Sequence, residues 1–153
     1  MAALEEKLNN DFKSALKSQD AIKVSVIRML KADITNNLVK LNKKSLIDEE
    51  IIKIIQSHVR KHGESIEQFK KGNRLDLVEK EERELKILKN YLPEQMPDQE
   101  LEALVKSAIN SIGATSIKDS GKIIKIVLEK AKGKTDGKKV SQIVARLLTG
   151  VEQ

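Results

Sequence analysis

An all-α protein is predicted by three features of this 153-residue sequence. Apolar residues recur every three or four positions almost throughout, which is the spacing of one face of an α-helix, and no clean alternation of apolar and polar residues indicates a strand. Charged residues make up 34% of the chain and aromatic residues only 2%. This composition is typical of a helical protein with an aliphatic core, and not of a β-sandwich or barrel.

Residues 1–92 are predicted to form an N-terminal bundle of about four helices. Three of the helices have a polar residue placed to cap the start: Asp20 for the second helix, Ser45 in a capping box with Asp48 for the third, and Asn73 for the fourth. The apolar stripes comprise Leu4, Leu8, Phe12, Ala15 and Leu16, then Ile22, Val26, Ile27, Leu30, Ile34, Leu38 and Leu41, then Ile51, Ile54, Ile55, Val59, Ile66 and Phe69, and finally Leu77, Val78, Leu85, Leu88 and Tyr91.

A domain boundary is predicted at the two prolines of the chain, Pro93 and Pro97. Proline lacks the backbone N–H donor and restricts the preceding residue, so the fourth helix must end here. We therefore expect a linker over 93–97 and a small three-helix module over 98–153. Its helices are expected at about 98–112, 117–131 and 138–149, with Gly113 and Gly150 as C-terminal stops, Ser116 and Asp119 as a capping box, and Asp136 as the last cap.

Residues suited to catalysis are scarce. The chain has no cysteine, which excludes disulfides, thiolate zinc sites and a cysteine nucleophile. Three residues separate Gly133 from Gly137, whereas a phosphate-binding loop needs four before its Gly-Lys, so nucleotide hydrolysis is not expected. No serine adjoins a plausible base in a recognisable nucleophile elbow. We expect no catalytic residue and no cofactor.

A histidine pair on the third predicted helix is the one candidate for metal binding. His58 and His62 are four residues apart, a spacing that can place two imidazoles on one ion. The glutamate of the His-Glu-x-x-His motif is absent, and Arg60 and Lys61 lie between the histidines. We therefore interpret the pair as partly exposed histidines and expect no metal. Glutamates 79, 81, 82 and 84 alternate with basic residues, which is typical of a solvated helix face.

The excess positive charge is concentrated near the C-terminus. Between Lys118 and Arg146 lie nine basic and three acidic residues, and their net charge of +6 equals that of the whole chain. Such charge beside a helix N-terminus favours phosphate oxygens, although a lysine-rich solubilising surface is an alternative. No aromatic residue interleaves, so RNA would be bound through its backbone and shape. The predicted RNA-binding residues are Lys122, Lys130, Lys132, Gly133, Lys134, Gly137, Lys138 and Lys139.

The sequence also bears on location. The first six residues lack the basic and apolar regions of a secretory signal, and no apolar run approaches the roughly 18 residues of a transmembrane helix. We therefore expect a cytoplasmic protein without a membrane partner.

Several blocks of the sequence, in the right order, resemble the YqeY family, also called the GatB/YqeY domain. They are residues 26–32, 64–72, 74–78, 91–95, 118–122 and 132–138. The resemblance spans almost the whole chain and implies an N-terminal helical bundle with a small C-terminal module. In the B subunit of the glutamine-dependent tRNA amidotransferase, a similar region forms the helical and tail part, and the tail contacts tRNA. Amide transfer and ATP-dependent activation in that enzyme reside outside this region.

The resemblance thus implies a non-catalytic accessory protein that binds tRNA or other structured RNA through its basic C-terminal face. One alternative is a docking module for an amidotransferase or synthetase subunit, and another is a component of a carbon–nitrogen ligase with glutamine as amido-N donor. The chain departs from the family pattern at Ser120, Lys125 and Glu129, where methionine, glycine and proline are common. Lys125 therefore either extends the basic face or blocks a close contact. The oligomeric state does not follow from the sequence.

Overall fold

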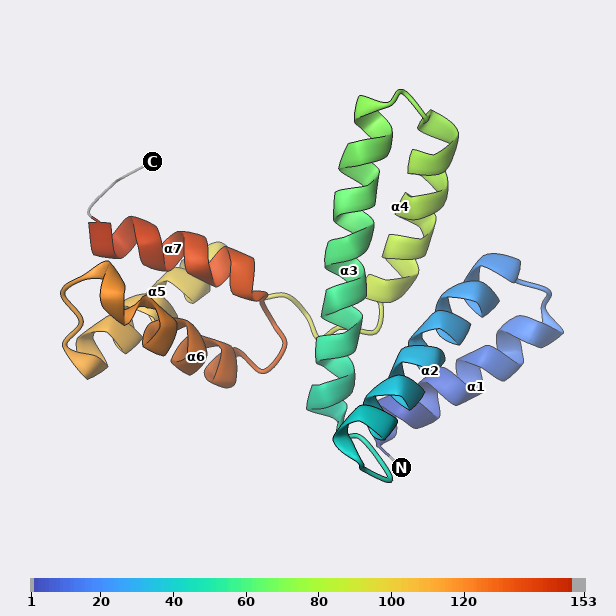
Figure 1. Cartoon of the computed structure of the whole chain (residues 1–153), viewed down its shortest axis with the longest axis horizontal. Coiled ribbons are helices and arrows are strands. Elements are labelled where there is room, and N and C mark those ends of the chain that lie inside the picture. Colours follow the sequence, from blue (N-terminus) through green and yellow to red (C-terminus); the bar gives the residue numbers. More distant parts are fainter. Residues whose placement is uncertain (1, 150–153) are drawn as a thin grey trace. The chain divides into compact units, whose positions relative to one another are not determined.

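The computed structural model describes residues 2–149, and every regular element in that range is helical (Figure 1). The all-α prediction is thus confirmed. The chain divides after Leu92 into two compact units. The first holds α1 (Ala3–Lys17), α2 (Ala21–Leu41), α3 (Asp48–Lys71) and α4 (Leu75–Lys89), and the second holds α5 (Asp98–Ile112), the short 3₁₀ helix η1 (Ile117–Asp119), α6 (Ser120–Ala131) and α7 (Gly137–Thr149).

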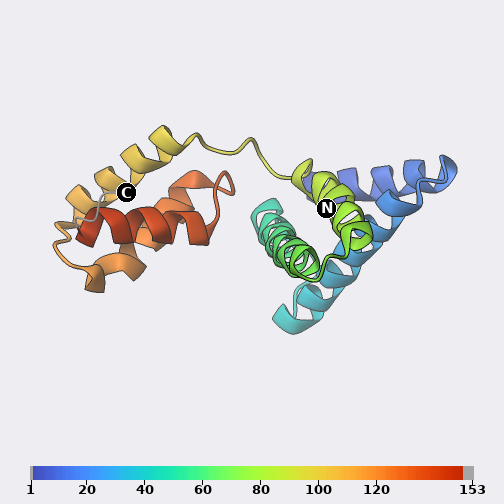
Figure 2. The same ribbon diagram turned by 90° about the horizontal axis from the view of Figure 1, so that it is seen from above.

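In the first unit, α3 and α4 form a hairpin and lie side by side in both views, as α1 and α2 do (Figures 1 and 2). The helices bury most of the apolar stripes read from the sequence, but Leu16 and Leu41, which were assigned to these stripes, are exposed. The core of this unit comprises Leu8, Val26, Ile27, Leu30, Ile34, Leu46, Ile51, Ile55, Leu88 and Tyr91. The phenol of Tyr91 donates a 2.5 Å hydrogen bond to Asp11 Oδ2, which joins the end of the unit to α1.

The helix caps of the first unit agree with the sequence only in part. Asp20 caps α2, because its Oδ1 accepts the Lys23 N–H at 3.1 Å. The capping box predicted at Ser45 is wrong: Leu46 is buried before the helix begins, and Glu50 Oε1 accepts the Ile47 N–H at 3.2 Å. Asn73 does not cap α4 either. Its left-handed φ of 55° ends α3, and the cap position of α4 belongs to Arg74.

The second unit is a three-helix module around its own core. That core comprises Leu101, Val105, Ala108, Ile123, Val127, Val140 and Val144. Gly113 ends α5 with a left-handed φ of 66°, as predicted. The capping box predicted at Ser116 is wrong, because η1 precedes α6 and the Ser116 side chain makes no cap hydrogen bond. The stop predicted at Gly150 lies outside the described residues.

No helix within residues 2–149 is long and apolar enough to cross a membrane.

Candidate functional site

The turn between α6 and α7, residues 132–136, is the centre of the predicted RNA-binding face. Helix α6 ends because Lys132 and Gly133 both adopt left-handed backbone conformations, with φ of 49° and 83°. Glycine adopts this conformation without the steric penalty of a Cβ. The Lys134 N–H donates to the Ala131 carbonyl at 3.0 Å, and the Met96 N–H donates to the Lys134 carbonyl at 2.8 Å. The lysine side chains therefore extend from a turn whose backbone is held in place.

The start of α7 is capped by an acidic residue, as the sequence predicted. Asp136 Oδ1 accepts the Lys139 N–H at 2.8 Å. This N–H is one of the groups at a helix N-terminus that could otherwise bind an anion. Asp136 therefore occupies one of these N–H groups and places a negative charge beside the others, which disfavours an anion at this helix end.

The predicted lysines divide into two groups. Lys122, Lys130, Lys132, Lys134 and Lys138 are exposed, and none of them forms an ion pair with an acid among residues 2–149. Lys139 differs, because its Nζ pairs with Asp98 Oδ1 of α5. Arg146 likewise lies 3.1 Å from Glu102 Oε1 of α5. The charges of Lys139 and Arg146 are therefore partly neutralised within the module.

Two of the unpaired lysines, Lys122 and Lys138, lie where the helix dipole disfavours positive charge, whereas Lys130 lies in the last turn of α6, where positive charge is favoured. Helices α1, α3, α4 and α5 carry acidic residues in their first turn, whereas α6 and α7 carry none. Lys122 is the third residue of α6, and Lys138 is the second residue of α7. A cation near the positive end of a helix dipole costs about 0.3–1 kcal/mol at an exposed site. These lysines therefore do not stabilise their helices.

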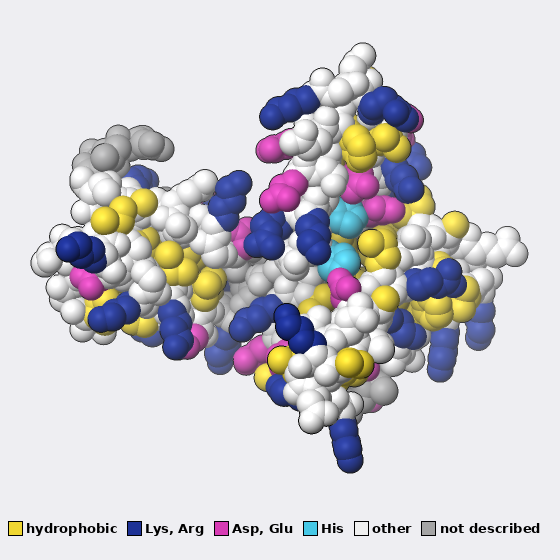
Figure 3. All heavy atoms as spheres, viewed as in Figure 1, with side chains coloured by type: hydrophobic (Ala, Val, Ile, Leu, Met, Phe, Trp, Pro, Cys, Tyr) yellow, Lys and Arg dark blue, Asp and Glu magenta, His cyan; other side chains and the backbone are white. Residues whose placement is uncertain are grey.

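Lys125 extends the basic face. It is exposed and lies one turn beyond Lys122 on α6, while Ile123 and Val127 turn toward the core. Lys125 consequently does not block helix packing within the module, although Glu129, one turn further, is also exposed. On the face seen in Figure 3, the basic side chains of this unit stand apart from one another, with uncharged surface and a few acidic side chains between them.

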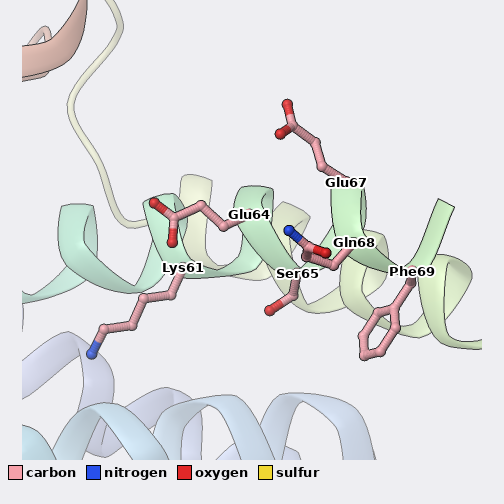
Figure 4. Close-up of a pocket in the computed structure, with 6 residues that line it drawn as sticks. All are labelled: Lys61, Glu64, Ser65, Glu67, Gln68 and Phe69. Atoms are coloured by element: carbon pink, nitrogen blue, oxygen red, sulfur yellow. The ribbon is translucent and has the colours of Figure 1, made fainter. Parts of the chain in front are cut away.

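A shallow hollow in the first unit has no comparable chemistry. Six residues of α3 line it: Lys61, Glu64, Ser65, Glu67, Gln68 and Phe69. In Figure 4, Lys61 and Phe69 extend to one side of the helix and Glu67 to the other. These side chains do not converge on one point, so the hollow does not assemble an acid–base pair.

The histidines are not where the sequence analysis placed them. His58 and His62 are buried, with only 6% and 9% of their surface exposed, so the prediction of partly exposed histidines is wrong. Glu84, assigned to a solvated face, is also buried because α4 packs along α3. The sequence contained a signal for this burial. The histidines continue the apolar stripe of α3 between Ile55 and Ile66 at helical spacing.

Each histidine faces carboxylates from a neighbouring helix (Figure 3, cyan and magenta). His58 Nε2 pairs with Asp33 Oδ2 of α2. His62 Nε2 lies 3.0 Å from Glu84 Oε2 and 3.6 Å from Glu81 Oε2 of α4. The spacing of four residues did not reveal these partners, because they come from other helices.

The fold and the basic turn define a small all-α protein with a lysine-rich three-helix module. Residues 5–148 match the family described as Yqey-like protein, and the chain belongs to this family. The predicted family resemblance is thereby confirmed.

Several fungal proteins are similar to this chain. The protein "Altered inheritance of mitochondria protein 41, mitochondrial" of Pyrenophora tritici-repentis is 30% identical over 93% of this chain and 79% of its own length. The proteins of the same name from Lachancea thermotolerans and Candida glabrata are each 33% identical. The matches cover 69% and 57% of this chain, respectively. They span only 57% and 48% of those two relatives.

These relatives correct the expected location. The names of all three place them in mitochondria, so the prediction of a cytoplasmic protein is wrong in their light. The prediction used the absence of a secretory signal. An expectation of that kind does not distinguish the cytoplasm from an organelle.

Proposed function

We propose that this chain is a non-catalytic accessory protein that binds tRNA or another structured RNA. The observation that carries the proposal is the position of the unpaired lysines. Two of them, Lys122 and Lys138, lie at the starts of α6 and α7, where positive charge is unfavourable for the helices. Lys130, Lys132 and Lys134 lie at the end of α6 and in the turn that follows it. A polyanionic partner explains why Lys122 and Lys138 are present, because its phosphates would offset the repulsion between these lysines and the positive helix ends.

The mode of binding follows from the residue types. A lysine ammonium group is a compact point charge that attracts phosphate oxygens without recognising a base. The exposed lysines Lys122, Lys130, Lys132, Lys134 and Lys138 would contact the backbone of the RNA. Gly133 shapes the turn, whereas Gly137 is the first residue of α7. Lys139 contributes less to RNA binding than the sequence predicts, because its ammonium group pairs with Asp98. Binding of this kind is tolerant of RNA sequence and sensitive to salt.

The resemblance to the amidotransferase B subunit supports binding without catalysis. The region similar to this chain forms the tail of that subunit, and the reaction takes place elsewhere in the enzyme. We therefore assign no amide-transfer step to this chain. The rival proposal is a protein-docking module, in which the same lysines meet the acidic side chains of an amidotransferase or synthetase subunit.

A mobility-shift experiment with bulk tRNA separates these proposals. Because the relatives are named as mitochondrial proteins, mitochondrial tRNA is a second probe. We expect the wild-type protein to shift both. The double variant Lys134→Glu/Lys138→Glu should lose the shift, whereas Lys13→Glu/Lys17→Glu, the same charge change at exposed positions of α1, should retain it. Equal tRNA affinity of the two double variants would contradict RNA binding by the tail and favour protein docking.

A further inference from the structure

A histidine and two glutamates meet between α3 and α4, outside the proposed RNA-binding face. His62 Nε2 lies 3.0 Å from Glu84 Oε2 and 3.6 Å from Glu81 Oε2. The three ligand-type atoms all lie within 4.8 Å of one another. Only 11% of the His62 side chain, 21% of Glu81 and 10% of Glu84 are exposed. We propose that these residues bind a divalent metal ion of the zinc type.

The hydrogen bond made by the other ring nitrogen of His62 supports a cation at this point. Its Nδ1 lies 2.8 Å from the backbone carbonyl oxygen of His58, which can only accept, so Nδ1 carries a hydrogen. In a neutral imidazole, Nε2 then presents a lone pair. This lone pair faces carboxylate oxygens, which also present lone pairs when ionised. A cation between the three groups resolves their repulsion, and a carbonyl partner on the second nitrogen is the usual arrangement of a metal-binding histidine.

The distances agree with coordination by zinc. Zinc binds histidine nitrogen and carboxylate oxygen at about 2.0–2.2 Å, so tetrahedral ligands are separated by about 3.3–3.6 Å. The observed separations of 3.0 and 3.6 Å from His62 Nε2 to the two glutamate oxygens differ from this range by at most a few tenths of an ångström, and the two glutamate oxygens lie within 4.8 Å of each other. Two carboxylates and a neutral imidazole also balance the charge of a divalent cation. Three protein ligands leave the fourth position for water or another ligand.

This site differs from the histidine pair considered in the sequence. His58 Nε2 pairs with Asp33 of α2, so His58 contributes its backbone carbonyl and not its ring. Arg60 and Lys61, whose charges argued against a metal, are exposed, whereas His62 is buried. The ligands that replace His58 are the two glutamates one turn apart on α4. A bound ion would therefore connect α3 to α4.

The test is zinc binding by the full, tag-free chain after removal of metals with a chelator. In equilibrium dialysis against zinc chloride, we expect saturation at about one ion per chain. Glu81→Gln keeps the shape of a partly buried side chain and removes a ligand charge, so we expect it to weaken binding about tenfold or more. Glu82→Gln is the matched control, since Glu82 is an exposed neighbour outside the cluster. It should bind zinc as the wild type does.

Cobalt(II) provides a second measurement that needs no variant. We expect the wild-type chain to give the intense visible absorption of a four-coordinate cobalt site, and zinc to displace it. Zinc binding that is not saturable would overturn the proposal, as would equal affinity of the wild type and Glu81→Gln. Absence of the cobalt absorption would overturn it even if Glu81→Gln did not fold. In each of these cases His62 and Glu84 would form only a hydrogen-bonded pair.

Discussion

The Asp136 carboxylate accepts a 2.8 Å hydrogen bond from the backbone N–H of Lys139 and so caps α7. This carboxylate lies in the turn whose lysines are proposed to bind phosphate. Asp136 therefore stabilises the helix and, by its charge, opposes an anionic partner. The two effects can be separated by substitution.

Asp136→Ala should lower the free energy of unfolding by about 1 kcal/mol, because the helix loses its cap. Asp136→Asn is the matched control, since asparagine caps a helix about as well as aspartate and removes the charge. We expect the Asp136→Asn variant to keep its stability and to bind tRNA as tightly as the wild type or more tightly. Urea unfolding and tRNA titration on the same preparations measure both quantities. Weaker tRNA binding by Asp136→Asn would show that the carboxylate itself contributes to the interface.

Lys138→Glu should change stability and RNA affinity in opposite directions. An acid in the first turn of α7 interacts favourably with the helix dipole, so the free energy of unfolding should rise by about 0.3–1 kcal/mol. The same change removes a phosphate contact and adds repulsion, so tRNA affinity should fall. Thermal unfolding and tRNA binding measure the two effects. A variant that loses stability and affinity together would instead indicate a structural role for Lys138.

Tyr91 should make the stability of the first unit depend on alkaline pH. Burial, together with the hydrogen bond to Asp11 and the negative charge of that residue, raises the pKa of the Tyr91 phenol. Because this pKa is higher in the folded state, the stabilisation is present below the unfolded pKa of about 10 and is lost as the pH rises above it. Tyr91→Phe should lower the free energy of unfolding by about 0.5–1.5 kcal/mol at neutral pH. It should also make that free energy less dependent on pH above about pH 10. Urea unfolding between neutral pH and about pH 11 tests this, and an unchanged alkaline profile in Tyr91→Phe would contradict it.

A protease specific for glutamate should cut first after Glu94. Glu94 and Gln95 are exposed and lie outside any helix, whereas the Met96 N–H is bound to the Lys134 carbonyl. The products should be fragments 1–94 and 95–153, identified by mass spectrometry, and each should remain helical if residues 1–92 and 98–153 fold independently. First cleavage within α3 or α4 would contradict the predicted boundary.

The elements that the sequence predicted well depend on local signals. The helix predicted over 98–112 matches α5 (Asp98–Ile112), because a proline precedes it and Gly113 ends it. Asp20 and Asp136 cap the helices to which they were assigned. Ser45 and Asn73 do not, since burial of Leu46 and the left-handed conformation of Asn73 moved the helix ends. A capping motif indicates a helix start only where burial or backbone conformation of the neighbouring residues does not shift that start.

The features that the sequence did not reveal depend on contacts between helices. Lys139 pairs with Asp98 and so joins α7 to α5. The positions of these two residues in the sequence do not predict that they meet. His62 likewise meets Glu81 and Glu84 only because α4 packs along α3. The sequence shows the concentration of positive charge between Lys118 and Arg146. It does not show which of these lysines form ion pairs and which remain unpaired.

The central claim is that the unpaired lysines of α6, of the α6–α7 turn and of the start of α7 bind the phosphate backbone of RNA. The most direct measurement is the affinity of the full chain for tRNA over a range of salt concentrations. About four phosphate contacts predict a log–log slope near −3, and each of Lys130→Ala, Lys132→Ala, Lys134→Ala and Lys138→Ala should reduce its magnitude by up to about one. Lys13→Ala, on α1, should leave the slope unchanged. A flat salt response, or the same slope in all of these variants, would contradict the account.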